Sequence, residues 1–478
     1  MSINIQAMGL SVLMLVFTLS GWGKEPAKAV PFAPKAAEES VLQLSDEQVD
    51  NIVRRSYQYV AMYNVNNKFA LAQGGWNTVA ADTRLKDHTM TEIARPNNDT
   101  LYVGAMMDLR KDPVVLDIPA FDSTYASLMV TGYDHYVNVP LSVTKGDFSE
   151  PVKALFYTSR TEGYAGEKVE GIDLYYKMTG DFVSGVFRIM PHANDEARFE
   201  KITQQMQSVK LMTLSEFQGK PAIAIDDVQF PNVGQSDLDV YENNFLEVMQ
   251  FVVNHTSFDS ANELDQEFLA AMKPLGIEPG QVFTEDNVVA IDGKQFRAAA
   301  DKLRQQEFAR AQDPVETAKH GLRYFQPKGE IDLTTQLIQS VIGPIGLPAT
   351  EAVYPLIVAA DGSHMNAQHD YVIHMSEDEL PPAKAFWSIT LYDTANGFFI
   401  PNDRKKYSVG ENSGMKLNSD GGLDVYISAE KPDGVPAENW LPINRQDEQL
   451  DIILRIYNPA LEQYKTYVAP KAEVIDSK

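Results

Sequence analysis

Apolar residues recur along this chain with two different spacings, and the change between them divides it into regions. After Ser45, apolar side chains follow one another at helical spacing. Ser45 and Gln48 have the pattern of a capping box, which favours a helix that begins near Asp46. The spacing therefore predicts an N-terminal amphipathic helix of about five turns.

Beyond Arg95, short alternating or apolar runs separated by Gly, Pro and Asp indicate strands over residues 101–107, 114–118, 125–131 and 183–189. Helical spacing returns between residues 197 and 342, with helices expected over 199–209, 238–253, 264–272 and 296–308. Strands are expected again over residues 353–358, 371–375, 386–392, 423–427 and 452–457. This order predicts an α+β, mainly β protein with a helical segment between two β regions.

The two β regions share a pattern of strand, proline-containing loop, and second strand with an aromatic residue two positions before serine. The members are residues 114–118, Pro119 and Tyr125-Ala-Ser127 in one region, and residues 371–375, Pro381 and Phe386-Trp-Ser388 in the other. Chance is the competing explanation, because alternating strands resemble one another. A real repeat predicts two related antiparallel β-sandwiches in which these strand pairs superpose.

The first residues carry a different signal. Residues 7–19 are uncharged and mostly apolar, but fall short of the roughly 20 residues that span a bilayer. Small residues follow, as at the cleavage site of a secretory signal peptide. We expect residues 1–23 to be a signal peptide and residues 24–44 a flexible leader, against the alternatives of an uncleaved anchor or a buried helix. After cleavage the protein should not be embedded in a membrane.

Composition removes several classes of function. The net charge is −25, from 41 basic and 66 acidic residues, which would repel a nucleic-acid backbone, so no nucleic-acid partner is expected. The chain has 0 cysteines, which excludes disulfides, thiolate nucleophiles and Cys-ligated metals. Residues 221–272 are acidic and lack Lys and Arg, which indicates either a solvated helix face or a surface for a cation or basic partner.

Several ordered runs resemble two bacterial domain-of-unknown-function families. The first half is similar to family 1254 through Arg95-Pro-Asn-Asn-Asp-Thr-Leu-Tyr102 and Pro113-Val-Val-Leu-Asp-Ile-Pro119. The second half is similar to family 1214 through runs that include Ala385-Phe-Trp-Ser-Ile-Thr-Leu-Tyr-Asp393, Gly397-Phe-Phe-Ile-Pro-Asn402 and Asn439-Trp-Leu-Pro442. The resemblance implies an exported envelope protein, periplasmic or secreted, built from jelly-roll-like sandwiches, with no established activity. The expected domains are residues 45–195, which include the N-terminal helix, and residues 346–478, with a mainly helical segment at 196–345.

The loop that starts at Arg95 packs a cation, two amides and a carboxylate into five residues. Pro96 favours an extended backbone at the arginine, and the asparagines favour a turn. One interpretation is an Asx turn with an Arg95–Asp99 ion pair. The other is a site in which the arginine binds an anionic or polyhydroxyl ligand. The candidate ligand-binding residues here are Arg95, Asn97, Asn98, Asp99 and Tyr102.

Other chemistry is weakly indicated. His364, His369 and His374 form a histidine cluster, but a strand over residues 370–375 would send His369 and His374 to opposite faces, so no metal and no cofactor is expected. Asp99, Asp134 and Asp393 lie near strand ends, where sandwich enzymes place acids and bases, although aspartates there more often form turns. Further candidate ligand contacts, against a role in the core, are Trp387, Asn402 and Trp440.

Two functions are compatible with these patterns. The preferred one is a non-catalytic exported envelope protein that binds a small molecule or glycan, or assembles as a homo-oligomer, because no hydrolase or phosphate-loop motif is present. The alternative is a secreted, glycan-directed hydrolase that uses Arg95, Asp99 and Asp393. The two differ in whether these three side chains meet in one solvent-open cleft.

Overall fold

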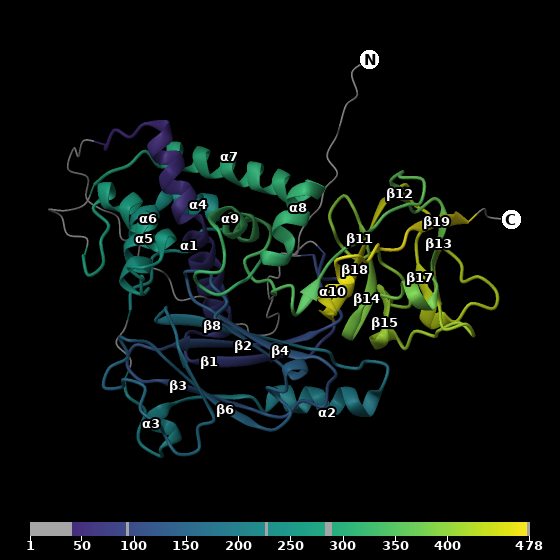
Figure 1. Cartoon of the computed structure of the whole chain (residues 1–478), viewed down its shortest axis with the longest axis horizontal. Helices are drawn as coiled ribbons and strands as arrows, with labels where there is room; N and C mark the ends of the chain where they lie inside the picture. The colour runs from purple at the N-terminus through teal and green to yellow at the C-terminus, as the bar shows by residue number, and fades with distance from the viewer. Residues whose placement is uncertain (1–40, 92–94, 225–227, 283–288, 476–478) are drawn as a thin grey trace.

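The computed structural model describes residues 41–91, 95–224, 228–282 and 289–475, which form two β units and a layer of helices (Figure 1). The predicted signal peptide and residues 24–40 of the predicted leader lie outside these ranges. The α+β class is confirmed, with many antiparallel strands in several sheets and an N-terminal helix. Over the described ranges, no helix combines the length and the apolar character needed to cross a membrane.

The first β unit has two sheets. One has the strand order β1-β2-β8-β4-β5, with bounds Thr78–Asp82, Leu101–Asp108, Phe182–Ile189, Ala126–Thr131 and Val139–Ser142. The other has the order β7-β6-β3-β9, with bounds Leu174–Lys177, Val152–Tyr157, Val114–Ile118 and Lys210–Thr213. Because β9 pairs with β3, this unit extends beyond the predicted boundary at residue 195. Helices α2 (Glu196–Gln207) and α3 (Leu214–Phe217) flank β9.

Successive side chains of β2 enter two different cores. Leu101 and Val103 point between the two sheets, into a cluster shared with β3, β4, β6 and β8. Tyr102 and Met106 point to the opposite side, where they pack with residues of helix α1 (Asp46–Gln73). Both faces of this sheet are therefore covered, and β4 and β8 are buried along their whole length.

The second β unit also has two sheets. In one, β18 (Gln449–Pro459) pairs with β14 (Ala383–Asp393), which pairs with β15 (Ser408–Gly410). The far side of β18 pairs with three short strands, β10 (Ala352–Val353), β11 (Leu356–Ile357) and β12 (Met365–Asn366). The other sheet has the order β17-β16-β13-β19, with bounds Trp440–Pro442, Leu423–Ser428, Asp370–Met375 and Ala472–Ile475.

The two units share the order of three strands in one sheet and of all four strands in the other, and differ in the strands beyond β8 and β18. The order β8-β4-β5 in one corresponds to β18-β14-β15 in the other, and β7-β6-β3-β9 corresponds to β17-β16-β13-β19. Each second sheet has one parallel pair, β6 with β7 and β16 with β17. The register repeats as well, because Ser127 is paired with Arg188 and Ser388 with Arg455. The predicted repeat is thus present in strand order and register, and close superposition of the two strand pairs stays a prediction.

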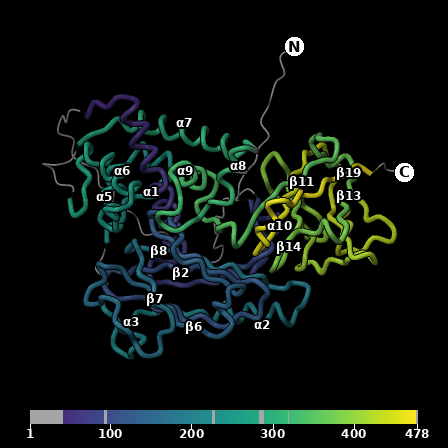
Figure 2. The backbone as a smooth tube through the Cα atoms, viewed as in Figure 1, coloured from purple at the N-terminus to yellow at the C-terminus, as the bar shows by residue number. Residues whose placement is uncertain are grey.

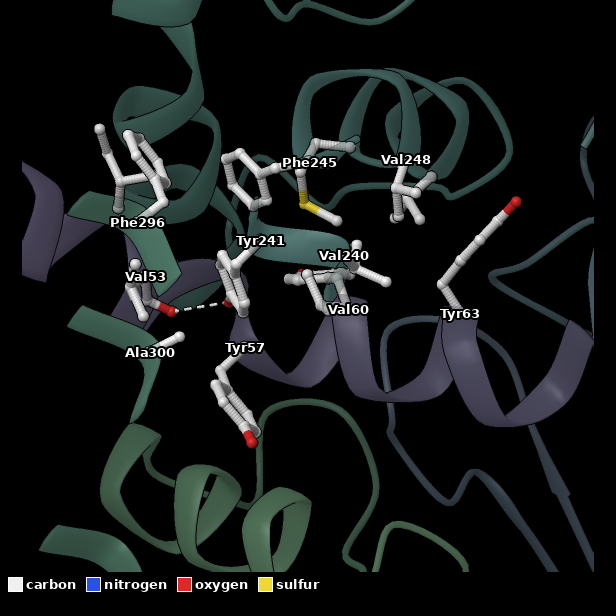
Figure 3. Packing of buried hydrophobic residues seen from close by; sticks show 14 of the residues in the cluster. Val53, Tyr57, Val60, Tyr63, Val240, Tyr241, Phe245, Val248, Phe296 and Ala300 are labelled. Atoms are coloured by element: carbon white, nitrogen blue, oxygen red, sulfur yellow. Dashed lines mark hydrogen bonds between the residues drawn. The ribbon is translucent and has the colours of Figure 1, made fainter. Parts of the chain in front are cut away.

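A layer of helices covers the first sheet on the side away from β3 and β6 (Figure 1). It contains α1, α4 (Asp237–Asn243), α5 (Phe245–Asn254), α6 (Glu263–Met272), α7 (Gly293–Gln312), α8 (Pro314–His320) and α9 (Leu333–Ile342). Helix α1 starts at the predicted capping box and packs against α4, α5, α6, α7 and α9. In this core Tyr57 stacks on Tyr241, whose hydroxyl donates to the Val53 carbonyl at 3.4 Å (Figure 3).

Helix α1 packs both within the helical layer and on the first sheet, so its predicted grouping with the first β domain stays a prediction. Two predicted elements differ from the structure. The helix predicted over residues 238–253 is broken at Asn244, whose φ of −153° is not helical. The strand predicted over residues 353–358 is divided into β10 and β11, because Pro355 lacks the N–H that would continue the ladder.

The remaining short helices connect strands or helices. They are α10 (Leu461–Tyr464), η1 (Val143–Lys145), η2 (Lys273–Leu275), η3 (Gly321–Arg323), η4 (Glu377–Glu379), η5 (Glu411–Ser413) and η6 (Ala437–Asn439). The second β unit lies beside both the helical layer and the first β unit (Figure 2).

Candidate functional site

The loop before β2 packs against the second β unit. Arg95 is 3% exposed and has a left-handed backbone with φ 54°, whereas Pro96 predicted an extended one. Its N–H donates to the Gly397 carbonyl at 2.5 Å, and its guanidinium pairs with Asp451. The arginine therefore forms an ion pair between the two β units, and not the predicted one with Asp99.

Asn97 and Asp99 extend this contact. The Asn97 side-chain oxygen accepts from the Asp99 N–H at 2.7 Å, which is the predicted Asx turn, and its amide donates to the Tyr457 hydroxyl at 2.8 Å. The Asp99 carboxylate is 1% exposed and accepts from the Ser388 hydroxyl at 2.7 Å. Burial raises the pKa of Asp99, and Arg455 opposes that rise. The loop predicted to bind a ligand thus joins the two β units.

Arg455 lies at the centre of this junction and is fully buried. Its Nη2 donates to the Tyr392 hydroxyl at 2.6 Å and to the Arg95 carbonyl at 3.4 Å. The guanidinium carbon lies 5.5 Å from the centre of the Tyr392 ring, within cation–π range. Asp99 lies near enough to interact with its charge. A buried cation, a carboxylate and tyrosine hydroxyls therefore hold the units together.

Arg188 occupies the equivalent position in the first unit. It is 2% exposed, lies 5.9 Å from the centre of the Tyr102 ring, and donates through Nη2 to the Ile345 carbonyl at 2.8 Å. Its Nη1 is buried and has no hydrogen-bond partner among the described residues. The two arginines thus share a strand position but differ in their partners.

Arg188 lines a cavity of about 870 Å³ where the first sheet, the end of the helical layer and the second β unit meet. Much of the remaining wall is aromatic or aliphatic, including Leu322, Tyr324, Phe325, Ile345, Tyr354 and Tyr467. Phe325 has a φ of 57°, and a Cβ on Gly346 would lie 2.0 Å from its ring. Only glycine at position 346 leaves this wall in place.

Polar groups near the cavity are few and differ in charge. Glu351 is buried and paired with Lys145 at 2.7 Å, yet burial raises the pKa of Glu351. Burial also raises the pKa of Tyr354 to about 12, while Arg188 and Arg455 act to lower it. The Tyr354 hydroxyl therefore keeps its proton at neutral pH and can donate a hydrogen bond. The arrangement offers one buried guanidinium and a phenol donor beside an apolar wall, and a more exposed cation, Lys465, that is already paired with Glu462.

The other predicted acids lie in different surroundings. Asp134 is 1% exposed, and the Lys328 amino group is 3.7 Å from its carboxylate and 2.6 Å from that of Asp265. Asp393 accepts from the Ala395 N–H at 3.0 Å and so shapes its own turn. Because Asp99 and Asp134 are buried, the three predicted acids do not form a solvent-open set.

The remaining predicted ligand residues have structural partners. Trp387 packs in the core between the two sheets of the second unit. The Asn402 amide donates to a carbonyl of its own loop at 3.1 Å, and the Trp440 Nε1 donates to the Ser428 carbonyl at 3.0 Å. Asn98 is half-buried beside the interdomain contact.

The histidines of the predicted cluster are all exposed, and His369 lies outside the strand on which it was predicted to face away from His374. Burial alternates along β13, which leaves His374 on the exposed face, where its Nδ1 lies 2.5 Å from the Asp424 carboxylate. His369 precedes this strand on an exposed turn, and His364 is also exposed. In the part of the chain that the structure describes, no three His, Asp or Glu side chains gather as a metal-binding group.

Sequence reasoning missed Arg188 and Arg455, although a signal was present. Each is a single arginine inside a short apolar run, in Phe187-Arg-Ile189 and Leu454-Arg-Ile456. A charged residue at a position that the pattern predicts to be buried is expected to have a specific partner. The occurrence of such an arginine in both β regions pointed to the buried junction more directly than the repeated strands did.

Comparisons with known proteins identify families and a fold. Residues 76–210 match the model of a protein of unknown function, DUF1254, and residues 351–461 match that of another, DUF1214. No curated protein matches the chain. The crystal structure of the VPA0106 protein from Vibrio parahaemolyticus is similar in fold, with a TM-score of 0.68 and 22% identity over 90% of this chain and 100% of that one. An uncharacterized protein from Burkholderia cenocepacia has a TM-score of 0.41 and 13% identity over 90% of this chain and 93% of that one.

Proposed function

This chain carries a DUF1254 domain followed by a DUF1214 domain, and we propose that it is an exported envelope protein that binds a small organic molecule in the cavity between its two β units. The observation that carries this proposal is the cavity itself. Its volume of about 870 Å³ falls in the range of small-molecule sites, roughly 300–1,000 Å³. Such sites are mostly apolar with a few placed polar groups, as this one is.

Non-catalytic binding accounts for the geometry better than hydrolysis does. The hydrolase alternative requires Arg95, Asp99 and Asp393 at one open cleft. The first two are 3% and 1% exposed and hold the units together, and the third shapes a turn. The cavity, in contrast, is lined by residues from both β units and from the segment between them, as expected of an interdomain ligand site.

A neutral apolar fluorophore tests the proposal without depending on charge. N-phenyl-1-naphthylamine should bind the wild-type chain, and Leu322→Trp, which enlarges a half-buried side chain in the wall, should weaken that binding about tenfold or more. Leu417→Trp is the matched control, because Leu417 is 54% exposed and is not part of the wall. Fluorescence titration measures both. Equal affinity in the two variants, or no binding by wild type, would contradict the proposal.

Export is supported by the short apolar segment at residues 7–19 and the small residues after it. Protein recovered from the envelope fraction should have lost roughly 20 to 30 residues by intact-mass measurement. Full-length protein found in the cytosol alone would refute export.

We also propose that each β unit has a jelly-roll fold. This proposal is supported by two sheets of mostly antiparallel strands around one hydrophobic core in each unit. An experimental structure whose strand connections do not form two Greek keys would exclude it.

A further inference from the structure

Arg188 is the feature of the cavity that the apolar wall does not explain. A guanidinium has five N–H donors and stays charged at all ordinary pH values. Here one donor is satisfied by the Ile345 carbonyl, and the buried Nη1 has no partner in the described ranges. Leaving a buried charged donor unpaired is costly, so such a group calls for a counter-ion or ordered water.

The other buried arginines nearby have acidic partners within the protein. Arg95 pairs with Asp451, and Asp99 lies close enough to act on the charge of Arg455, although the Nε and Nη1 of Arg455 also lack hydrogen-bond partners among the described residues. No described Asp or Glu lies within 4.0 Å of the Arg188 side-chain nitrogens. The acid beside the cavity, Glu351, already has Lys145 at 2.7 Å. The junction therefore has an uncompensated positive charge at the residue that lines the cavity.

The strand repeat makes this difference specific. Arg188 and Arg455 are each paired with a serine on the neighbouring strand, Ser127 and Ser388. Ser388 donates to Asp99, which supplies the negative charge in the second unit. Ser127 instead accepts from the Tyr125 hydroxyl at 3.1 Å, a neutral partner. Among the described residues, the serine beside Arg188 therefore lacks the carboxylate partner that the serine beside Arg455 has.

We propose that the cavity binds an amphipathic monoanion, a carboxylate on an aromatic or aliphatic body, whose charged group is received by Arg188. This rests on the proposed function, since it names the class of ligand for the same cavity. Arg188 is the buried cation of the wall, since the other lining cation, Lys465, is 52% exposed and pairs with Glu462 at 2.7 Å, so a monocarboxylate is favoured over a dianion. Tyr354, which lines the same cavity, supplies a second donor, and Phe325, Leu322 and Tyr467 contact the apolar body.

The test compares the binding of three ligands to the wild-type chain; the ligands share a phenylbutyl skeleton and differ in the terminal group and its charge. The ligands are 4-phenylbutanoate, 4-phenylbutan-1-ol and 4-phenylbutylammonium, measured by isothermal titration calorimetry at pH 7. The carboxylate should bind about tenfold tighter or more than the alcohol, and the ammonium weakest of all. This order runs against the net charge of −25, which disfavours anions in general. Equal affinity for carboxylate and alcohol would overturn the inference.

Variants assign the preference to one side chain. Arg188→Met should abolish the difference in affinity between carboxylate and alcohol, because the apolar replacement has no charge to receive the carboxylate. Arg188→Lys should keep part of the preference, since it retains the charge but not the planar fork. Arg304→Met, at a side chain 49% exposed, is the matched control and should change nothing.

The outcomes separate the two proposals. If the neutral fluorophore binds and Leu322→Trp blocks it, but carboxylate and alcohol bind equally, the anion inference fails and the proposed function stands. If neither the fluorophore nor any of the three ligands binds, both fail. A carboxylate preference that survives Arg188→Met would also overturn the assignment to Arg188.

Discussion

Replacing Arg455 with methionine is expected to lower the free energy of unfolding by about 3–5 kcal/mol at neutral pH, as when one partner of a buried charge pair is removed. The substitution removes the hydrogen bond to Tyr392. It also removes the cation near Asp99, whose carboxylate is only 1% exposed and would then be buried without that cation. Urea unfolding at pH 8 and pH 5 measures the effect. Arg304→Met, at an exposed position, should cost less than about 0.5 kcal/mol.

The pH dependence of this loss has a definite sign. Burial already raises the pKa of Asp99, and Arg455 lowers it, so the variant should have a still higher Asp99 pKa. When the pKa of a carboxyl is higher in the folded than in the unfolded state, the free energy of unfolding of the protein falls as pH rises from the unfolded to the folded pKa. The loss should therefore be larger at pH 8 than at pH 5. Asp99→Asn in the same chain should recover part of it, and strict additivity of the two changes would contradict the coupling.

Lys328→Met is expected to cause a loss of similar size, about 3–5 kcal/mol, for a different reason. The Lys328 amino group lies 2.6 Å from the carboxylate of Asp265 and 3.7 Å from that of Asp134, and these residues are 0% and 1% exposed. The variant lacks the Lys328 amino group, so the two buried carboxylates lose the positive charge that lies close to both. Chemical unfolding of the variant measures the cost.

Its control and rescue follow from the same geometry. Lys302→Met breaks the ion pair with Asp50, in which the lysine side chain is 58% exposed, and should cost no more than about 1 kcal/mol. Adding Asp265→Asn to Lys328→Met should restore part of the stability, because one buried charge is then gone. An equal cost for the two lysine variants, or no rescue, would show that the buried acids do not depend on Lys328.

Local patterns predicted local structure well. The pairing of Ser45 with Gln48 placed the start of α1 at Asp46, because a capping box acts within one turn of backbone. The aromatic-X-Ser pattern around Ser127 and Ser388 identified equivalent strands, because alternation reports which side of a strand is buried. These features depend only on neighbouring residues.

The candidate site depended on distant residues and was predicted poorly. The polar run from Arg95 to Asp99 is typical of an exposed strand entrance, but the contacts that bury it come from Asp451 and Ser388, far along the chain. Whether a second unit of the same chain docks on a loop is decided by tertiary packing, which periodicity does not report. The cavity could not be predicted for the same reason, since separate segments build its wall.

The position of α1 also determines the order in which the contacts of the fold can form while the chain is being synthesised. This helix is the first described element, yet it packs against α9, which ends at Ile342. The first β unit is fully synthesised once the chain has passed β9, but the outer side of its first sheet still lacks contacts with Phe325 and Ile345. Closing so long a loop is entropically costly and slow. The part of this apolar face that Phe325 and Ile345 cover therefore stays open until those residues have been synthesised, whereas α1 can cover its own part earlier.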